Sequence, residues 1–349
     1  MRKYKINCLL ALIMLGMTML TACSYRTDAQ PEETVAEESE DKIVIGFSQV
    51  GAESDWRKAN TISMKETFTE EKGYKLIISD AQQKQTKQIT AIRTFIQQEV
   101  DYIVLAPVTE DGWDTVLQEA KDAGIPVIII DRMVNVSDDS LYVCRVGSDF
   151  NIESGKVCNW LTQYIEYRGI EPSDINIVSI QGTLGSSSQI GRSAGLHKAV
   201  RSQGWNLLEE AEGEYTQARA REVMSSMLRK YDDINIVYCE NDNEAFGAID
   251  AIKAVGKHVG PNIQDGQILI VSFDGVSTQA IEMCRNGKIS CIAECNPMQG
   301  PRVEKIIEGL EKGEQPNKYE TVDEKLFTNI PVIKNVVSEG NLYPVTILD

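Results

Sequence analysis

Positive charge and histidine are scarce in this chain. Its 349 residues include 35 Lys and Arg against 52 Asp and Glu, which gives a formal net charge of −17. Nucleic acid would repel so acidic a chain, so we exclude a nucleic-acid-binding protein. The two histidines, His197 and His258, fall in a predicted helix and a polar loop, with nothing around them that a catalytic base or a metal ligand would need. We therefore expect no metal, no cofactor and no enzyme activity.

Long hydrophobic runs are absent after the first 22 residues. Residues 8–20 form an apolar stretch of thirteen residues, too short to cross a bilayer, which takes about 20. Positive residues precede the stretch, and the combination predicts a signal peptide over residues 1–22. The end of this segment, LTAC (20–23), resembles the lipobox of bacterial lipoproteins, in which the cysteine is lipidated. The resemblance implies that Cys23 anchors the protein to the outer face of the bacterial cell membrane, and an ordinary signal peptide with an incidental cysteine is the alternative.

Residues 23–41 hold almost no apolar side chains and carry seven acids against one base. Such a segment cannot bury enough apolar surface to order itself, so we expect a flexible acidic tether. An acidic recognition tail is the alternative, supported only by the charge. The chain from residue 42 onward has about 300 residues, enough for two domain cores of roughly 150 residues each.

Disulfides are not expected, although six further cysteines follow residue 41. The chain is too large to need covalent staples, and most of these cysteines fall within apolar strand or helix patterns. Cys291 and Cys295 look like a metal pair, but along a strand they would lie about 13 Å apart, too far to bond or to share an ion. We expect buried free thiols at six positions: Cys144, Cys158, Cys239, Cys284, Cys291 and Cys295.

Short apolar runs alternate with helical patterns from residue 42 onward. The runs KIVIG (42–46), YIVLA (102–106) and PVIII (126–130) have the near-continuous Val, Ile and Leu content of strands buried on both faces of a parallel sheet. The series starts again near residue 141, and two such series predict an α/β protein with two lobes. The helices are expected at residues 56–72, 86–98, 113–123, 152–167, 189–203, 218–231, 243–255 and 301–312.

Polar and aromatic side chains follow the predicted strands, at the edge where open α/β sheets bind ligands. Carboxylates, amides and guanidiniums together can accept from and donate to sugar hydroxyls, and an aromatic ring packs on the apolar face of a sugar ring. The mixture suits a neutral polyhydroxylated ligand, although each residue alone could be a strand-end cap or a turn former. The candidate ligand-binding residues are Trp56, Arg57, Asp80, Asp131, Arg132, Ser148, Arg192, Tyr215, Asn241, Phe273, Asp274 and Glu294.

Two glycine-containing loops could be taken for phosphate sites. The loop after the first strand has the single glycine Gly51, where a phosphate cradle would need several. The segment GTLG (182–185) lacks the lysine and the spacing of a P-loop, so we expect its glycines to give the backbone room near the ligand.

Six short motifs carry a family resemblance. They are FSQVGAESDWR (47–57), DAQQKQ (80–85), APV (106–108), DR (131–132), QGT (181–183) and SFDGV (272–276). Together they resemble the pentose- and hexose-binding periplasmic proteins of ABC importers, most closely the galactofuranose-binding branch, over residues 42 to about 312. The resemblance implies a type I periplasmic-binding-protein fold, in which two Rossmann-like lobes with parallel sheets are joined by a three-segment hinge. The implied N-terminal lobe is 42–147 with 295–328, and the C-terminal lobe is 148–294 with 329–349.

The resemblance also assigns roles. By motif position, Trp56 and Tyr215 match the family's aromatic walls, and its polar ligand contacts match Arg57, Asp131, Arg132, Arg192, Asn241, Asp274 and Glu294. One departure is Gln217, where the galactofuranose branch typically has an arginine two residues after the aromatic wall.

The implied function is that of an extracytoplasmic, lipid-anchored solute-binding protein. Such a protein acts as a monomer, captures a monosaccharide between two closing lobes and delivers it to an ABC permease with its ATPase. A sugar-sensing accessory protein that presents its ligand-bound form to a membrane receptor or histidine kinase is the alternative, and a sugar-processing enzyme ranks behind both. The predicted signal peptide, and the lack of a helix-turn-helix pattern before residue 42, argue against a repressor built from the same lobes.

Overall fold

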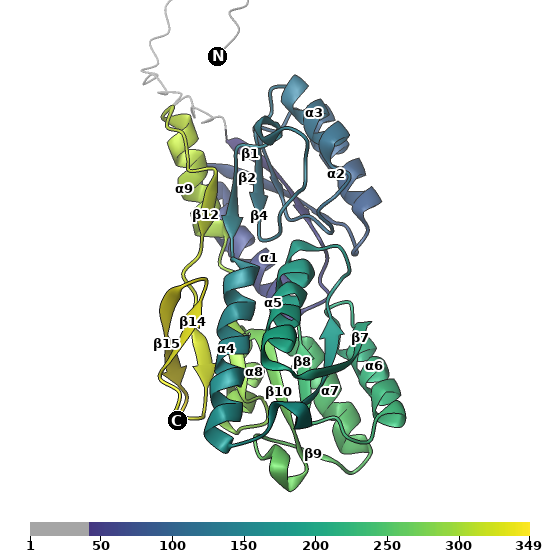
Figure 1. Ribbon diagram of the computed structural model, residues 1–349. Coiled ribbons are helices and arrows are strands. Elements are labelled where there is room, and N and C mark those ends of the chain that lie inside the picture. The colour runs from purple at the N-terminus through teal and green to yellow at the C-terminus, as the bar shows by residue number, and fades with distance from the viewer. Residues whose placement is uncertain (1–41) are drawn as a thin grey trace, which may run out of the picture. The chain divides into compact units, whose positions relative to one another are not determined.

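The computed structural model describes residues 42–349, which form two α/β lobes, each with a central sheet between helices (Figure 1). Residues 1–41, and with them the predicted signal peptide, Cys23 and the acidic tether, lie outside the described residues. No helix among the described residues is long and apolar enough to cross a membrane.

The first lobe contains a parallel six-stranded sheet in the order β12-β5-β4-β3-β1-β2. Helices α1 and α9 cover one face through Met64 and Val303, and α2 and α3 cover the other through Phe95 and Leu117. The bounds are β1 Ile43–Gln49, α1 Asp55–Thr67, η1 Glu70–Lys72, β2 Tyr74–Asp80, α2 Gln85–Gln97, β3 Tyr102–Leu105, α3 Asp114–Asp122, β4 Val127–Ile130, η2 Asp139–Leu141, β5 Cys144–Gly147, α9 Gly300–Glu311 and β12 Tyr319–Thr321.

The second lobe contains a nine-stranded sheet in the order β14-β15-β13-β11-β10-β8-β6-β7, with β9 paired to β10. Helices α4 and α5 pack on one face through Trp160 and Leu196, and α6, α7 and α8 pack on the other through Met224, Ile249 and Ala280. The bounds are α4 Phe150–Arg168, η3 Pro172–Asp174, β6 Asn176–Gln181, α5 Ser187–Gln203, β7 Asn206–Glu212, α6 Gln217–Lys230, β8 Ile236–Cys239, α7 Asp242–Ala254, β9 His258–Val259, η4 Ile263–Asp265, β10 Gln267–Asp274, α8 Thr278–Arg285, β11 Cys291–Glu294, β13 Leu326–Thr328, β14 Asn335–Ser338 and β15 Asn341–Ile347.

Three segments cross between the lobes. The first joins β5 to α4, the second joins β11 to α9, and the third, residues 322–325, joins β12 to β13. The third crossing lies earlier than expected, because β13 pairs with β11 and β15 and buries Leu326 in the second core. Residues 326–328 therefore belong to the second lobe, and the expected boundary at residue 328 was wrong.

The helix pattern in the sequence predicted most elements to within about two residues, but two local details differ. Helix α1 ends at Thr67, and the short 3-10 helix η1 fills the rest of the expected helix before Gly73, whose φ of 81° ends it. Helix α8 was not expected.

The six cysteines of the described residues are free and buried, which confirms the expectation of buried thiols.

Candidate functional site

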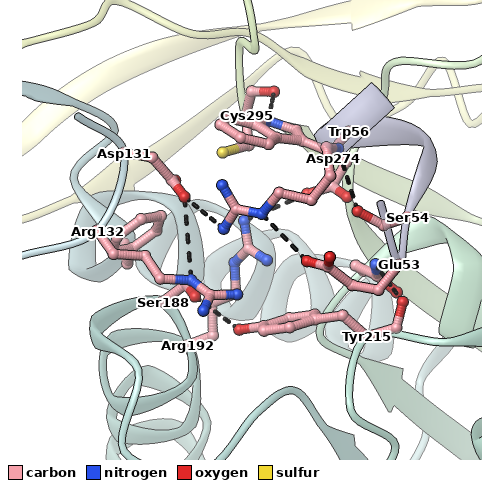
Figure 2. A pocket seen from close by; sticks show the side chains of 13 residues that line it. Glu53, Ser54, Trp56, Asp131, Arg132, Ser188, Arg192, Tyr215, Asp274 and Cys295 are labelled. Carbon is pink, nitrogen blue, oxygen red and sulfur yellow. Dashed lines mark hydrogen bonds and ion pairs between the residues drawn. The ribbon is translucent and has the colours of Figure 1, made fainter. Parts of the chain in front are cut away.

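A small cavity, about 20 Å³ in volume, lies where the carboxyl ends of strands from both sheets meet (Figure 2). The first lobe contributes side chains from the loop after β1, from the first turn of α1 and from the loop after β4. The second lobe contributes side chains after β7 and β8, at the end of β10 and from α4 and α5, and Cys295 lies in the crossing after β11. The lining residues are Glu53, Ser54, Trp56, Arg57, Asp131, Arg132, Phe150, Ser188, Arg192, Tyr215, Asn241, Asp274 and Cys295.

Arg57 lies in the first turn of α1 and is 3% exposed. The turn is fixed by Ser54, the N-cap, whose hydroxyl accepts a hydrogen bond from the Arg57 backbone N–H at 3.2 Å. The guanidinium donates through Nε to Glu53 Oε1 at 3.1 Å, and its Nη2 lies 2.6 Å from Asp131 Oδ2. Burial lowers the pKa of Arg57, but the charges of Asp131 and Glu53 outweigh it and raise the pKa above its usual value. Arg57 is therefore a fixed cation held between two acids.

Two contacts fix the indole of Trp56. Its indole Nε1 donates to the backbone carbonyl of Cys295 at 2.8 Å, in the second interlobe crossing. The Arg57 guanidinium lies 4.6 Å from the ring centroid, which is a cation–π distance. The indole is therefore fixed in orientation, as a stacking surface needs to be.

Asp131 and Arg132 follow β4 in an unusual backbone conformation. Asp131 has a φ of 62°, in the left-handed region that costs a non-glycine residue energy and is often found at functional sites. Arg132 donates to the Val108 carbonyl at 2.8 Å, and its Nε lies 3.9 Å from Asp131 Oδ2. Burial, and then the nearby charge of Arg57, lower the pKa of Arg132. The guanidiniums of Arg57 and Arg132 thus both lie near the Asp131 carboxylate.

Arg192 on α5 is the cation of the second lobe. Its Nε and Nη2 each lie 2.9 Å from Glu153 Oε2, its Nη2 lies 3.5 Å from Asp274 Oδ1, and it also donates to the Glu240 carbonyl. The guanidinium lies 4.7 Å from the Phe273 ring centroid. Asp274 has a φ of 101°, a second strained position. Burial raises the pKa of Asp274 well above its usual value, against the lowering effect of Arg192.

Tyr215 is held by its backbone, its hydroxyl and a glycine. Its φ is 59°, its N–H donates to Glu244 Oε1 at 2.9 Å, and its hydroxyl lies 2.7 Å from that of Ser188. The ring occupies the space beside Gly182, where a Cβ would come 1.8 Å from Tyr215 Cζ. Asn241, the N-cap of α7, donates to the Tyr215 carbonyl at 3.2 Å. Gly182 therefore leaves room for the Tyr215 ring.

Several buried polar atoms in this cavity have no hydrogen-bond partner within the described residues. They are the acceptors Glu53 Oε2 and Asp131 Oδ2, the latter in an ion pair with Arg57 but not aligned as a hydrogen bond, and the donors Arg57 Nη1 and Arg132 Nε. An unpaired buried polar group is costly, and such groups need an explanation. All four belong to the first lobe, and they point to a ligand that both donates and accepts.

Comparison with known proteins decides the family. The sequence matches the family described as "Periplasmic binding protein domain" over residues 45–311. This chain belongs to the periplasmic binding protein family. The type I fold and the two-lobe architecture expected from the sequence are confirmed.

The similar periplasmic binding proteins include several sugar-binding proteins. The chain is 36% identical to the galactofuranose-binding protein YtfQ of Escherichia coli (strain K12) over 290 residues, which is 82% of this chain and 87% of that protein. A crystal structure of a galactofuranose binding protein superposes with a TM-score of 0.76 at 35% identity, covering 82% of this chain and 94% of that one. The binding protein of the arabinose ABC transporter from Shewanella sp. ANA-3, bound to α- and β-L-arabinofuranose, superposes with a TM-score of 0.75 at 37% identity, covering 82% of this chain and 91% of that one.

Eight of the twelve candidate residues line the cavity of this periplasmic binding protein: Trp56, Arg57, Asp131, Arg132, Arg192, Tyr215, Asn241 and Asp274. The other four lie elsewhere. Asp80 is exposed and accepts from the Gln82 N–H, Ser148 and Glu294 take part in interlobe crossings, and Phe273 is fully buried beneath Arg192. Gln217 is exposed and donates to Asp250, so it does not face the cavity.

Five lining residues were not predicted: Glu53, Ser54, Phe150, Ser188 and Cys295. Glu53 carried a usable signal, because an acid four residues before an arginine can form an ion pair with it, as Glu53 does with Arg57. The others carried none, since a serine at a helix start or a cysteine after a strand reads equally well as a cap or as core.

Proposed function

We propose that this protein binds a neutral monosaccharide, in a furanose ring form, in the cavity between its lobes and delivers it to an ABC permease with its ATPase. The observation that supports this most strongly is a set of buried first-lobe atoms that have no hydrogen-bond partner among the described residues. They are Glu53 Oε2, Arg57 Nη1 and Arg132 Nε, together with Asp131 Oδ2, which is ion-paired with Arg57. A pair of neighbouring sugar hydroxyls, each of which donates once and accepts as well, satisfies such a set.

The charges and aromatic rings of the cavity support the same ligand class. Each guanidinium of the lining lies close to an acid, Arg57 and Arg132 to Asp131 and Arg192 to Glu153, so the lining does not favour an anion. Trp56 offers a fixed indole face, on which the C–H face of a sugar ring can pack. The furanose form is proposed because similar proteins are described as binding galactofuranose, fucofuranose and arabinofuranose.

Delivery rests on closure of the lobes. Between the two lobes, the Asp55 N–H donates to Asn243 Oδ1 at 3.0 Å, and the Met133 N–H donates to Ser187 Oγ at 2.8 Å. A ligand that contacts both lobes adds to these bonds and shifts the population toward the closed form, which the permease then recognises. We further propose that Cys23 is lipidated and holds the protein as a monomer at the outer face of the membrane, within reach of the permease.

A thermal-shift panel tests the ligand class. We expect one or a few of D-galactose, D-fucose, L-arabinose, D-ribose and D-fructose to raise the melting temperature, because saturation at about 100 times Kd adds about 2.7 kcal/mol of stability. Sugars of similar size that carry a carboxylate, such as galacturonic acid, should have no effect. If no neutral sugar shifts the melting temperature, the proposed function is wrong.

Ring size is tested with a matched pair of isomers that cannot interconvert. We expect 1,4-anhydro-D-galactitol, which has the five-membered ring, to bind more tightly than 1,5-anhydro-D-galactitol, which has the six-membered ring. Tighter binding of the six-membered ring would leave a sugar site but contradict the furanose assignment.

A further inference from the structure

Glu324 joins the three interlobe crossings through one carboxylate oxygen. It lies in the third crossing and is 7% exposed. Its Oε1 accepts from Ser148 Oγ in the first crossing at 2.6 Å, and from the Asn296 N–H in the second crossing at 2.6 Å. All three connections between the lobes therefore meet at this side chain.

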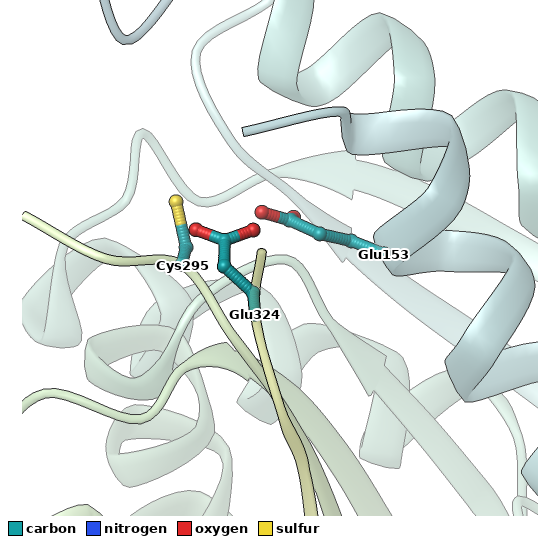
Figure 3. A group of neighbouring side chains, drawn as sticks. All are labelled: Glu153, Cys295 and Glu324. Carbon is teal, nitrogen blue, oxygen red and sulfur yellow. The ribbon is translucent and has the colours of Figure 1, made fainter. Parts of the chain in front are cut away.

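Glu324 belongs to a buried group that reaches both walls of the sugar cavity. Figure 3 shows its carboxyl group beside Glu153 and Cys295, and ligating atoms of the three side chains lie within 4.8 Å of one another. Glu153 Oε2 holds the Arg192 guanidinium, and the Cys295 carbonyl holds the Trp56 indole. The position of Glu324 is thus linked, through the Cys295–Asn296 backbone, to the stacking wall of the first lobe.

The surroundings of Glu324 act on its protonation in both directions: burial and the Glu153 carboxylate raise its pKa, and the Lys156 ammonium lowers it. Lys156 donates to the Glu324 backbone carbonyl at 2.6 Å, and Arg145 donates to the Ser148 carbonyl at 2.7 Å. Arg192 pairs with Glu153 and lowers its pKa, but burial has the larger effect and raises the pKa of Glu153 above its usual value. The other ionisable groups nearby are acidic, so they do not stabilise a charged Glu324 carboxylate. They are Asp149, Glu294, the exposed Asp323 and the Cys295 thiol. Two buried carboxylates this close repel each other, so one of the pair takes up a proton.

The hydrogen bonds at Glu324 leave one of its two carboxyl oxygens free to carry a proton. Glu324 Oε1 accepts from two donors, which leaves Oε2 to carry the proton, while Glu153 Oε1 is a buried acceptor with no hydrogen-bond partner in the described part of the chain. Burial, and then the charge of Glu153, raise the pKa of Glu324 to about 8. These are also metal-ligand types, but Arg192 and Lys156 already lie against the group, so we assign it to hydrogen bonding and not to an ion.

We propose that Glu324 is a positioning residue that, as a neutral acid, locks the three lobe crossings together and holds Trp56 in place for sugar binding. The role in binding rests on the proposed function, whereas the neutral-acid lock does not. Glutamine is an uncharged replica of protonated glutamate, with the same acceptor oxygen and an NH₂ group that can donate to Glu153. If Glu324 acts in this way, Glu324→Gln should retain the stability and the sugar affinity that Glu324→Ala loses.

The first experiment needs no sugar. Melting temperatures of the ligand-free protein are measured from pH 5 to pH 9 for the wild type, Glu324→Gln, Glu324→Ala and the control Asp323→Asn, which removes the exposed neighbouring acid. A pKa raised from 4.5 to about 8 contributes stability that is complete below about pH 4.5 and is lost as the pH rises toward 8. We expect the wild type to lose stability relative to Glu324→Gln as the pH rises from 5 to 8, and Asp323→Asn to follow the wild type. If the melting temperatures of the wild type and Glu324→Gln differ by the same amount at every pH, the proposed role of Glu324 as a neutral acid is wrong.

The second experiment measures the affinity for L-arabinose and for D-galactose at pH 7 and pH 9 by calorimetry. At one pH unit above its pKa about one-tenth of an acid remains protonated, so the wild-type affinity should fall by up to about tenfold between these pH values. Glu324→Gln should bind with nearly unchanged affinity at both pH values, and Glu324→Ala should bind about tenfold more weakly at pH 7. Equal losses in Glu324→Gln and Glu324→Ala would overturn the positioning role. Failure of the wild type to bind any sugar would overturn the proposed function, while the melting temperatures would still decide the role of Glu324.

Discussion

The ring of Tyr215 lies against the backbone of Gly182, so close that a Cβ at residue 182 would come 1.8 Å from Tyr215 Cζ. The centroid of the same ring lies 5.1 Å from the guanidinium of Arg132, which belongs to the first lobe. A glycine is therefore required for an aromatic wall at this place.

Gly182→Ala tests this relationship. The added methyl group should displace the Tyr215 ring and weaken sugar binding by about tenfold or more, since overpacking costs typically 1–3 kcal/mol. The control is Gly309→Ala on α9, where a Cβ would come no closer than 3.4 Å to Glu314 and φ is not positive. It should leave calorimetric affinity unchanged, and equal affinities of the two variants would contradict the account.

Asp131→Asn tests the charge shared by Arg57 and Arg132. Asparagine tolerates a φ of 62° about as well as aspartate, so the substitution removes the charge and keeps the backbone. Removing one partner of a buried ion pair typically costs about 3–5 kcal/mol, and urea unfolding should show a loss of that order. The exposed Asp139→Asn should fall within about 0.5 kcal/mol of the wild type. Unfolding midpoints that agree for the two variants would show that Asp131 does not neutralise these guanidiniums.

Stability should fall as the pH rises from 5 to 8. Burial raises the pKa of Glu240 to about 8 and that of Asp242 to about 7, and it raises the pKa of Glu244 and Asp274 well above their usual values. Acids with raised pKa contribute stability that is complete below their unfolded pKa and is lost as the pH rises through the folded pKa. Urea unfolding at pH 5, 6.5 and 8 measures the trend, and a free energy of unfolding that rises over this range would contradict it.

The buried thiols should be unreactive in the native protein. Burial raises the pKa of Cys144 to about 11 and that of Cys158 and Cys284 to about 12, so little thiolate exists at pH 8. In a protein comprising residues 42–349, a thiol reagent should react with no cysteine until guanidinium is added, and then with all six. Fast reaction in native buffer would show that the lobes expose a cysteine on opening, and Cys295, which lines the cavity, would be the residue to test first.

The sequence predicted the part of the site that follows from strand order. Ligands bind beyond the carboxyl ends of parallel strands, and this rule found Trp56, Asp131, Arg192 and the other residues whose side chains turn into the cavity. It could not tell which strand-end residues turn inward. Asp80 also follows a strand, but it caps a turn in which Gln82 has a φ of 51°, and so it faces solvent.

The hinge was the least predictable part. Ser148 and Glu294 fall at strand ends in the sequence, yet they lie where the chain crosses between lobes and bond to Glu324 and to the Lys325 N–H. Their partners are 176 and 31 residues away along the chain, so no local pattern could reveal the contacts. The third crossing was placed too late for the same reason, because the antiparallel pairing of β13 with β11 leaves no mark in the sequence.

A calorimetric titration of Arg57→Ala tests the central claim, a sugar site between the lobes, most directly. Arg57 has a buried donor, Nη1, without a partner among the described residues, and its neighbour Lys58 is exposed and pairs only with Asp55 there. The account predicts one L-arabinose or D-galactose bound per wild-type chain, a loss of about 1.5 to 3 kcal/mol in Arg57→Ala, and no change in Lys58→Ala. Wild-type affinity in Arg57→Ala would contradict the site.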